Sequence, residues 1–362
     1  MLIDSHTHFG DWDSVKPLEE MYDAMMTEMD ANGVDRFVIA VTGGYAGQYG
    51  GFRMADALWF KRRQPARVFV LGGLDWSGIV GGETKPLYPL PEQLDLLRSA
   101  GCDGLKLLNG KPDNRKVLGH ALDSEILEPM YRWLEENDWA CVWHVADPPE
   151  FWNPDTTPLW ARRNGWWYDE TCPQKVQIDG EARRVFAKHP TISFALAHFF
   201  FISQDLDAAD ELLAQNPGVN LDLAPGVEML HNFTANRDAA RAFFEKWSER
   251  ILYGTDIGMA AHGTHPERGW MVRHFLETND VFEVPDDAFM LPDDRHTLHG
   301  IGISPEACAN IYGKNAVRLL GETPAPMDDE ACRALCERLV ASAARHDATD
   351  AAAERFLAEL GG

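Results

Sequence analysis

The chain has no long uninterrupted hydrophobic run. None of its apolar stretches reaches the roughly 18 residues that a membrane-spanning helix needs. Its first residues, Met-Leu-Ile-Asp-Ser-His, lack the basic segment and the long apolar segment of a secretory signal peptide. We therefore expect a cytoplasmic protein with no membrane partner.

Positive charge and closely spaced cysteine pairs are also scarce. Lys and Arg total 33 against 57 Asp and Glu, which gives a formal net charge of −24. This balance argues against nucleic acid as a partner and leaves a small-molecule substrate, which can still be anionic if the pocket is locally positive. The six cysteines include no Cys-x-x-Cys, so they predict reduced thiols rather than a disulfide framework. Cys332 and Cys336 share one face of a predicted helix and are expected to pack in the core.

The chain does contain short β-branched and aliphatic runs at barrel-like spacing. Eight such runs are predicted to be strands: 1–8, 34–42, 67–75, 104–108, 140–145, 192–198, 219–223 and 250–256. Helical patterns lie between them, at 18–32, 54–63, 91–100, 126–137, 180–188, 205–216 and 237–247. This alternation predicts an α/β protein with a (β/α)₈ TIM barrel. An open doubly wound sheet fits less well, because no Gly-rich phosphate loop follows the first strand.

Three long segments interrupt the alternation, and all follow the carboxyl ends of predicted strands, where barrels build their active sites. They are a polar loop at 109–124, a Trp-rich loop at 146–177 and an irregular, His-rich stretch at 258–305. The Trp-rich loop predicts a substrate lid. A final barrel helix is expected after Tyr312, and two more within 328–360. We divide the chain into a catalytic barrel at 1–321 and an Ala-rich helical extension at 322–362, packed on the barrel, whose surface could support a homo-oligomer.

Polar side chains stand at the ends of several predicted strands. His6 and His8 end the first strand, and side chains two apart on a strand share a face. Four more such residues follow, in strands four, five, six and eight: Lys106, His144, His198 and Asp256. Each lies among apolar residues, where a charge or an imidazole is costly unless it is paired or ligated. Convergent imidazoles with a carboxylate predict a divalent metal site.

The stretches around these residues resemble the amidohydrolase superfamily, in particular its amidohydrolase-2 branch, which also holds relatives of aminocarboxymuconate-semialdehyde decarboxylase. The matching stretches are Ile-Asp-Ser-His-Thr-His, Gly-Leu-Lys-Leu, Val-Trp-His-Val-Ala-Asp-Pro, Ala-Leu-Ala-His-Phe-Phe, Leu-Asp-Leu-Ala-Pro-Gly and Ile-Leu-Tyr-Gly-Thr-Asp. They follow the family order over residues 1 to about 320. Together they are specific for the superfamily, and none alone is specific for a reaction.

The resemblance implies a role for each strand-end residue. Asp256 would touch the metal and accept the proton of the attacking water. His198 would be a second-metal ligand in a two-metal site, or an acid/base or charge-stabilising group in a one-metal site. Lys106 would be a carboxylated bridge in the first case and a substrate-facing or outer cation in the second. One divalent metal is expected, Zn²⁺ first with Mn²⁺ or Fe²⁺ as alternatives, and the implied ligands are His6, His8, His144 and Asp256.

Residues farther from the strand ends carry weaker predictions, each with a structural alternative. Arg53 could clamp a substrate carboxylate or be a surface charge at a helix start. Glu228 could face the mouth or be a solvated loop residue. Trp152 and the other lid tryptophans could stack on a substrate or form the lid's own small core. Asp147 could orient His144 as a hydrogen-bond acceptor. Three rim-loop histidines are expected at the surface, with contact between one of them and the substrate as the alternative: His231, His262 and His265.

Three functions remain open. The first is a metal-dependent hydrolase acting on a C–N or C–O bond of a small organic substrate, aromatic or carboxylate-bearing. The second is a metal-dependent non-oxidative decarboxylase of an aromatic or unsaturated acid. Decarboxylase relatives often carry basic residues in the loop after strand one, whereas this chain has no Arg between His8 and Arg36, which favours the hydrolase. The third is a catalytically idle metal-binding barrel.

Overall fold

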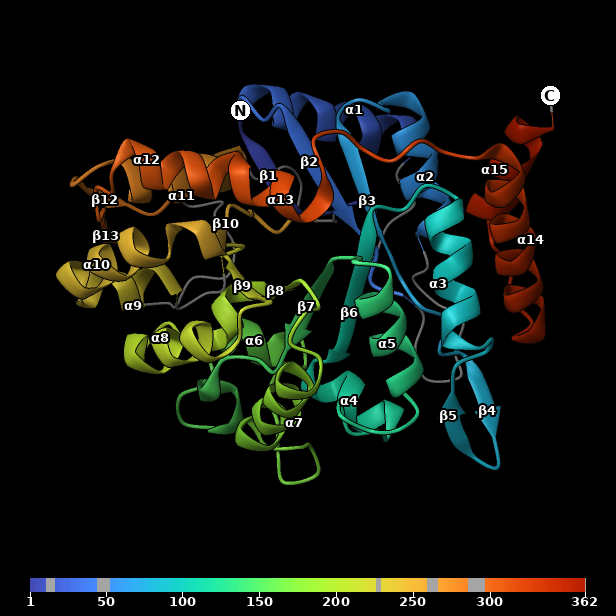
Figure 1. The fold of residues 1–362 in the computed structure, drawn as a ribbon, viewed down its shortest axis with the longest axis horizontal. Coiled ribbons are helices and arrows are strands. Elements are labelled where there is room, and N and C mark those ends of the chain that lie inside the picture. The colour runs from blue at the N-terminus through green and yellow to red at the C-terminus, as the bar shows by residue number, and fades with distance from the viewer. Residues whose placement is uncertain (11–16, 44–52, 226–228, 259–265, 286–296, 362) are drawn as a thin grey trace.

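Parallel strands form the centre of the fold. A computed structural model describes residues 1–10, 17–43, 53–225, 229–258, 266–285 and 297–361. Within these ranges the main sheet has the strand order β10-β9-β8-β7-β6-β3-β2-β1-β11, and its neighbouring strands are parallel (Figure 1). The strands are β1 (Ile3–His8), β2 (Arg36–Ala40), β3 (Val68–Gly72), β6 (Gly104–Gly110), β7 (Cys141–Val145), β8 (Phe194–Leu196), β9 (Val219–Asp222), β10 (Ile251–Leu252) and β11 (Ile257–Gly258).

The predicted eighth strand is broken into two pieces that close the ring. β10 pairs with β9, and β11 pairs with β1, so residues 253–256 join the two edges of the sheet. The break coincides with Asp256, whose φ of 54° lies in the left-handed region. The Asp4 side chain accepts from the Thr255 hydroxyl at 2.6 Å, which replaces regular strand pairing there. The chain is therefore the predicted TIM barrel, and the prediction of one continuous strand over 250–256 was wrong.

Alternate strand residues fill the lower interior of the barrel with apolar side chains. This cluster joins Ile3, Val38, Ala40, Phe69, Leu71, Val142, Ala195 and Leu252 of the strands with Ala316 of the helix at 315–320. The pairing of β1 with β2 shifts register between Asp4 and Thr7, so both Ile3 and His6 can face inward although they are three residues apart. Trp143 faces outward against Phe186, as predicted from its place before His144. The polar strand ends therefore lie above a closed apolar layer.

Helices cover the outside of the sheet. The predicted helices are present as α1 (Leu18–Ala31), α2 (Met54–Arg63), α3 (Leu90–Ser99), α5 (Glu128–Glu136), α7 (Lys175–Lys188), α8 (Leu206–Gln215) and α10 (Arg237–Trp247). Their buried side chains and the outward strand side chains form one large apolar layer. The helix expected after Tyr312 is α13 (Asn315–Leu320), preceded by α12 (Pro305–Ala309) and a π-helical turn η4 (Asn310–Lys314).

The three segments predicted as loops contain regular structure. The first holds α4 (Pro112–Leu118). The lid holds the 3₁₀ turn η1 (Pro149–Trp152) and α6 (Leu159–Arg163). The third holds α11 (Pro266–Glu277) and an antiparallel pair, β12 (Val281–Glu283) with β13 (Thr297–His299). The helices α4 and α6 are shorter than two full turns, so they carry too little amphipathic pattern to be predicted as helices. The remaining elements are β4 (Gly78–Val80), β5 (Glu83–Lys85), η2 (Ala197–Phe201), α9 (Met229–Ala235) and η3 (Ser248–Arg250).

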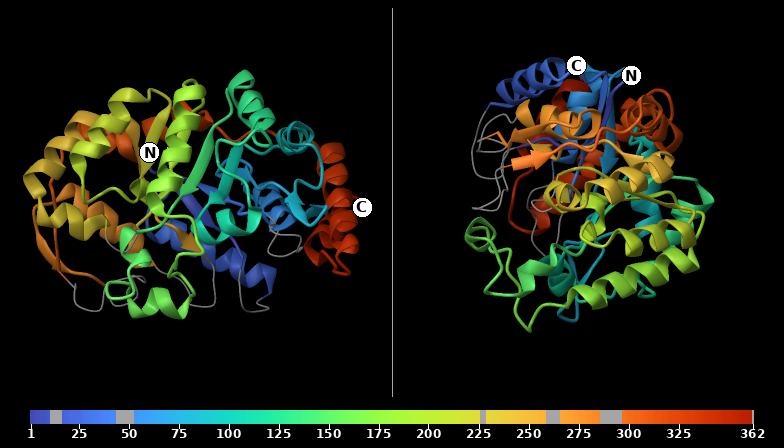
Figure 2. Two further views of the ribbon diagram at one scale, coloured as in Figure 1. Left: turned by 90° about the horizontal axis from the view of Figure 1, so that it is seen from below. Right: turned by 90° about the vertical axis from the view of Figure 1, so that its left-hand side faces the viewer.

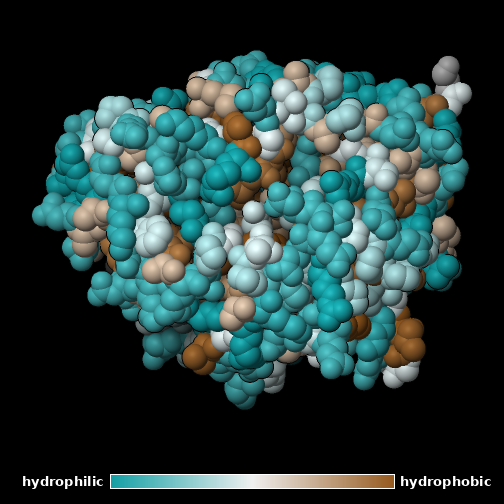
Figure 3. Space-filling model, viewed as in Figure 1, coloured by the Kyte–Doolittle hydropathy of each residue, from teal (hydrophilic) through white to brown (hydrophobic). Residues whose placement is uncertain are grey.

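Two C-terminal helices lie on the outside of the barrel. Figures 1 and 2 show α14 (Asp329–Arg345) and α15 (Ala351–Leu360), in red, beside α3 and α2. The Ser342 hydroxyl donates to Asp75 at 2.6 Å, which ties α14 to the loop after β3. Cys332 and Cys336 are buried, as predicted. Hydrophilic residues dominate the face in Figure 3, and none of the helices in the described ranges is long and apolar enough to cross a membrane.

A buried ion pair joins α2 to the segment before β6 and yields a stability prediction. The Lys61 ammonium donates to Asp103 at 2.6 Å and to the Gly101 carbonyl at 2.6 Å, and both charged side chains are almost fully buried. Lys61→Met leaves the Asp103 carboxylate buried without its cation. We expect a loss of about 3–5 kcal/mol in the free energy of unfolding, measured by urea denaturation.

Lys246→Met is the matched control for that experiment. Lys246 pairs with Asp210 at the surface, and both side chains are more than a third exposed. Exposed ion pairs contribute about 0–1 kcal/mol, so this variant should unfold close to the wild type. Equal urea midpoints for the two variants would contradict the expected cost at Lys61.

Candidate metal centre

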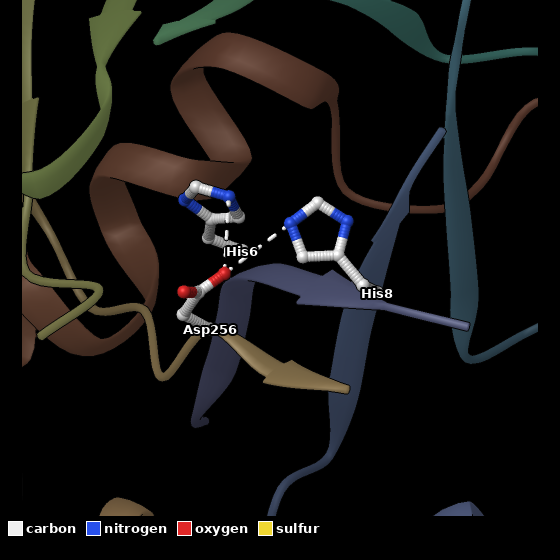
Figure 4. A group of neighbouring side chains, drawn as sticks. All are labelled: His6, His8 and Asp256. Carbon is white, nitrogen blue, oxygen red and sulfur yellow. Dashed lines mark ion pairs between the residues drawn. The ribbon is translucent and has the colours of Figure 1, made fainter. Parts of the chain in front are cut away.

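Three predicted ligands converge at the mouth of the barrel: His6 and His8 from β1, and Asp256 from the break in strand eight (Figure 4). Their ligand atoms all lie within 4.8 Å of one another. Asp256 Oδ1 is 3.2 Å from His8 Nε2 and 3.7 Å from His6 Nε2. Ligands about 2.1 Å from a tetrahedral Zn²⁺ stand about 3.4 Å apart, so the spacing fits one such ion.

The hydrogen bonds behind the rings fix which nitrogens face the centre. His6 Nδ1 lies 2.8 Å from Asp222 Oδ2, and His8 Nδ1 lies 2.7 Å from the Ala40 carbonyl oxygen. Both Nδ1 atoms face acceptors and therefore carry protons, so a neutral ring at either position has its lone pair on Nε2. Two lone pairs and a carboxylate oxygen then face one another. A shared cation satisfies all three atoms, which is how metal-binding histidines are held.

Asp222 is the side chain that organises this end of the barrel. It ends β9 and is buried. Besides His6, it accepts from the backbone N–H of His198 at 2.9 Å and of Ala224 at 3.1 Å, both through Oδ1. Sequence reasoning quoted the Leu-Asp-Leu stretch but gave Asp222 no role. The available signal was an acidic residue ending an apolar strand, which is the same signal that drew attention to Asp256.

Lys106 reaches the same centre from β6. Its ammonium donates to His6 Nε2 at 2.8 Å, and its side chain is buried. Burial lowers the pKa of Lys106 to about 8, although the neighbouring Asp222 and Asp256 carboxylates act in the opposite direction. Lys106 is thus a cation directly beside the predicted ligands.

His198 and His144 lie next to His6 in the same group. The His198 ring centroid is 5.3 Å from that of His6 and 4.9 Å from that of His144. His144 is not among the three residues whose ligand atoms lie within 4.8 Å of one another. His198 Nδ1 lies 3.0 Å from the Ala224 carbonyl, so its neutral ring presents a lone pair on Nε2.

Burial determines the charge state of the imidazoles. It lowers the pKa of His6 and His144, and it lowers the pKa of His198 to about 3. These rings are therefore neutral near pH 7, which is the form that binds metals. Burial acts to raise the pKa of Asp256, but its contact with His8 and the positive charge that His198 and His6 carry when protonated act in the opposite direction and hold that pKa well below its usual range. Asp256 is an ionised carboxylate at neutral pH.

The lid is joined to His144 through Asp147, as predicted. Asp147 Oδ1 lies 3.2 Å from His144 Nε2, while Oδ2 accepts from the Lys111 ammonium at 2.6 Å and from the Tyr168 hydroxyl at 2.5 Å. Tyr168 belongs to the lid, and Lys111 precedes α4. Side chains from two loops therefore orient one imidazole at the strand-five end.

The lid tryptophans pack on one another. Phe151, Ala161 and Tyr168 form a small buried cluster, with Trp152, Trp160 and Trp166 packed against it. The Trp152 ring lies 4.8 Å from that of Tyr168, and its N–H donates to the Pro173 carbonyl. Trp152 is packed against the lid's own core, and its contact with a substrate stays a prediction.

The other outer predictions have different outcomes. Arg53 precedes α2, where it donates to Asp56 at 3.2 Å, and its side chain lies close against Gly10, two residues beyond His8. The prediction of a surface position for His231 was wrong, because α9 buries this ring. Glu228, His262 and His265 lie outside the described residues.

Comparison with known proteins supplies the family. The profile of the amidohydrolase family matches residues 3–321. None of the curated proteins matches the chain significantly. An amidohydrolase from Burkholderia multivorans with bound zinc is 17% identical, with a TM-score of 0.54 and coverage of 90% of this chain and 100% of its own.

Two further solved structures share the fold. A 5-carboxyvanillate decarboxylase from Sphingomonas paucimobilis is 15% identical, with a TM-score of 0.51 and coverage of 88% and 98%. A probable 2-pyrone-4,6-dicarboxylic acid hydrolase from Acinetobacter baumannii is 12% identical, with a TM-score of 0.50 and coverage of 88% and 99%. At such identities these likenesses establish the barrel fold, and the profile match establishes the family. The chain belongs to the amidohydrolase family, in its amidohydrolase-2 branch.

Proposed function

We propose that this protein is a metal-dependent hydrolase that cleaves a C–N or C–O bond of a small organic substrate. The observation that carries the proposal is the convergence of His6, His8 and Asp256, whose ligand atoms are spaced for one ion. The amidohydrolase family and its solved relatives are enzymes. Zn²⁺ is the first candidate, with Mn²⁺ or Fe²⁺ as alternatives, because imidazole and carboxylate ligands suit all three. His144 is the candidate for a further ligand.

A bound divalent metal would supply a Lewis acid and lower the pKa of water to about 7. The chain's own residues then divide the remaining work. Asp256, ionised and at the mouth, accepts a proton and passes it to the leaving group. His198 presents an Nε2 lone pair, so in its neutral form it accepts a hydrogen bond from water rather than donating one to an oxyanion. Lys106 offers a buried positive charge to a substrate or, if carboxylated, a bridge between two metals.

A decarboxylase is the second candidate. A solved relative named for decarboxylation shares the fold. A decarboxylase would need the substrate carboxylate held by cations, and Lys106 and Arg53 are candidates for that role. The absence of any Arg between His8 and Arg36 leaves the loop after β1 poor in guanidinium groups, which favours hydrolysis.

Metal content and product analysis test the proposal. The purified protein should contain about one Zn²⁺ per chain, lose it to a chelator and regain it, with a rise in melting temperature on reloading. Purified His6→Ala and His8→Ala proteins should bind none, whereas His274→Ala, a matched change on α11, should bind normally. A wild-type protein that binds no divalent metal after reconstitution would overturn the proposal.

Reaction type is read from the products. The first probes are 2-pyrone-4,6-dicarboxylate and 5-carboxyvanillate, followed by a panel of amides, lactones and aromatic acids. A hydrolase places solvent ¹⁸O in a product. Release of carbon dioxide without ¹⁸O incorporation would select the decarboxylase, and metal binding without turnover across the panel would select the idle barrel.

A further inference from the structure

Asp256 holds a backbone conformation that its own sequence does not favour. Its φ of 54° is left-handed, a region that residues with a Cβ seldom adopt, although Asp enters it more often than most. This conformation lets the chain leave β10 and rejoin β1 as β11 while the carboxylate faces His8 at 3.2 Å. Something in the surrounding structure must hold it there.

Strand β1 holds the N–H side of this turn. The Asp256 N–H donates to the His6 carbonyl at 2.8 Å. The Thr255 N–H donates to Asp4 Oδ1 at 3.2 Å, and the Ile257 N–H donates to the Thr255 hydroxyl at 3.3 Å. Three successive donors are therefore satisfied, and two of them by β1 itself.

Arg268 holds the carbonyl side. It lies near the start of α11 and is only 2% exposed. Its Nη1 donates to the Asp256 carbonyl at 2.8 Å and to the Thr255 carbonyl at 3.2 Å. A single guanidinium nitrogen thus bonds the carbonyls of Thr255 and Asp256, which flank the Asp256 Cα.

A buried acid balances this guanidinium. Glu28, from α1, is 2% exposed, and together with Asp256 it supplies the negative charge that acts on Arg268. Helices α1 and α11 pack on each other, so both ends of the interaction are fixed in the helical layer. Arg268 does not belong to the three ligands, and sequence reasoning gave neither it nor Glu28 a role.

We propose that Arg268 is a positioning residue that fixes the Asp256 carboxylate for cation binding and proton transfer, with Glu28 as its buried counter-charge. The inference rests on the proposed function, because the carboxylate it positions is the one that would bind the metal. Arg268 bonds the backbone carbonyls of residues 255 and 256, and its charge also acts on the Asp256 carboxylate.

The test measures Zn²⁺ affinity by competition with a chelating dye, in the full-length protein. Arg268→Met should weaken Zn²⁺ binding by about 10–100-fold, the usual effect of removing a group that orients a ligand. Arg268→Lys, which keeps the charge on a shorter side chain without the planar guanidinium, should recover part of the loss. In an Asp256→Asn background, Arg268→Met should cost little further affinity, because the group through which it acts is already altered. A merely structural role would give the same loss in both backgrounds.

Arg250→Met is the matched control. Arg250 is half-buried and also donates to two backbone carbonyls, those of Asn216 and Val219. Its loss should lower stability and leave Zn²⁺ affinity unchanged. Unchanged Zn²⁺ affinity in folded Arg268→Met protein would overturn the proposal. If the Arg268→Met protein does not fold, the Zn²⁺ affinities of the Arg268→Lys and Glu28→Gln proteins are compared with the wild type instead.

A crystal structure of the Arg268 variant separates this proposal from the proposed function. We expect Asp256 to leave the left-handed region, or its Oδ1 to move beyond ion-pair distance of His8 Nε2. An unchanged Asp256 would overturn the positioning role even if the wild type binds Zn²⁺. A wild type that binds no Zn²⁺ would overturn the proposed function, while the position of Asp256 in the variant would still decide whether Arg268 holds it.

Discussion

Asp256→Asn should reduce turnover by about 10²–10⁴-fold, the contribution expected of a positioned acid/base group. The amide has nearly the same shape as the carboxylate, but it cannot take up a proton and offers the facing nitrogens one oxygen and one N–H₂. His8 Nε2 and His6 Nε2 both face this side chain, so the variant should also bind Zn²⁺ more weakly. Steady-state kinetics on the substrate found in the screen, together with Zn²⁺ titration, measure the two effects.

Asp210→Asn is the control for this change. Asp210 is a surface residue that pairs with Lys246 and accepts from the Trp247 N–H, far from the strand ends in the fold. Circular dichroism should show both variants folded, and only Asp256→Asn should be impaired. A full turnover rate in folded Asp256→Asn protein would exclude proton transfer by Asp256.

The sequence predicted the barrel well because its signals are local and repeated. Buried parallel strands are short apolar runs, and two helices, 54–63 and 237–247, were predicted with the bounds that the structure has. The eighth strand was not predicted correctly, because its apolar pattern continues through a break that depends on tertiary contacts. Two distant residues hold that break: Asp4 from β1 and Arg268 from α11. No local sequence pattern encodes either contact.

The candidate site likewise has features that the sequence predicts and features that depend on tertiary structure. Each strand-end residue could be found because a polar group in an apolar run is conspicuous, and the structure brings His6, His8 and Asp256 together as predicted. His144 was predicted as an equal ligand; its ring packs on that of His198, it is not among the three residues whose ligand atoms lie within 4.8 Å of one another, and its role as a ligand stays a prediction. How far each ring reaches depends on strand stagger and on hydrogen bonds such as that of His144 to Asp147, and a single sequence specifies neither.

Asp222→Asn should weaken Zn²⁺ binding by about 10–100-fold, the range found when the partner of a metal-binding histidine is removed. Oδ1 of Asp222 accepts two backbone N–H bonds, so the Asn oxygen will take that place and turn its N–H₂ toward His6 Nδ1. Nδ1 must then accept rather than donate, which moves the ring proton to Nε2. The protonated Nε2 would face Asp256 and the Lys106 ammonium and could no longer bind a metal.

The tautomer change can be distinguished from simple destabilisation. In the metal-free Asp222→Asn protein, ¹⁵N NMR of His6 should show the proton on Nε2, whereas the wild type should carry it on Nδ1. Asn220→Asp is the matched control, because Asn220 lies two residues earlier on β9 and donates to the Phe194 carbonyl, below the metal centre. That variant should lose stability without changing the His6 tautomer. If Asp222→Asn keeps the proton on Nδ1 and binds Zn²⁺ like the wild type, then Asp222 does not set the tautomer of His6, and the ring must be oriented by its packing alone.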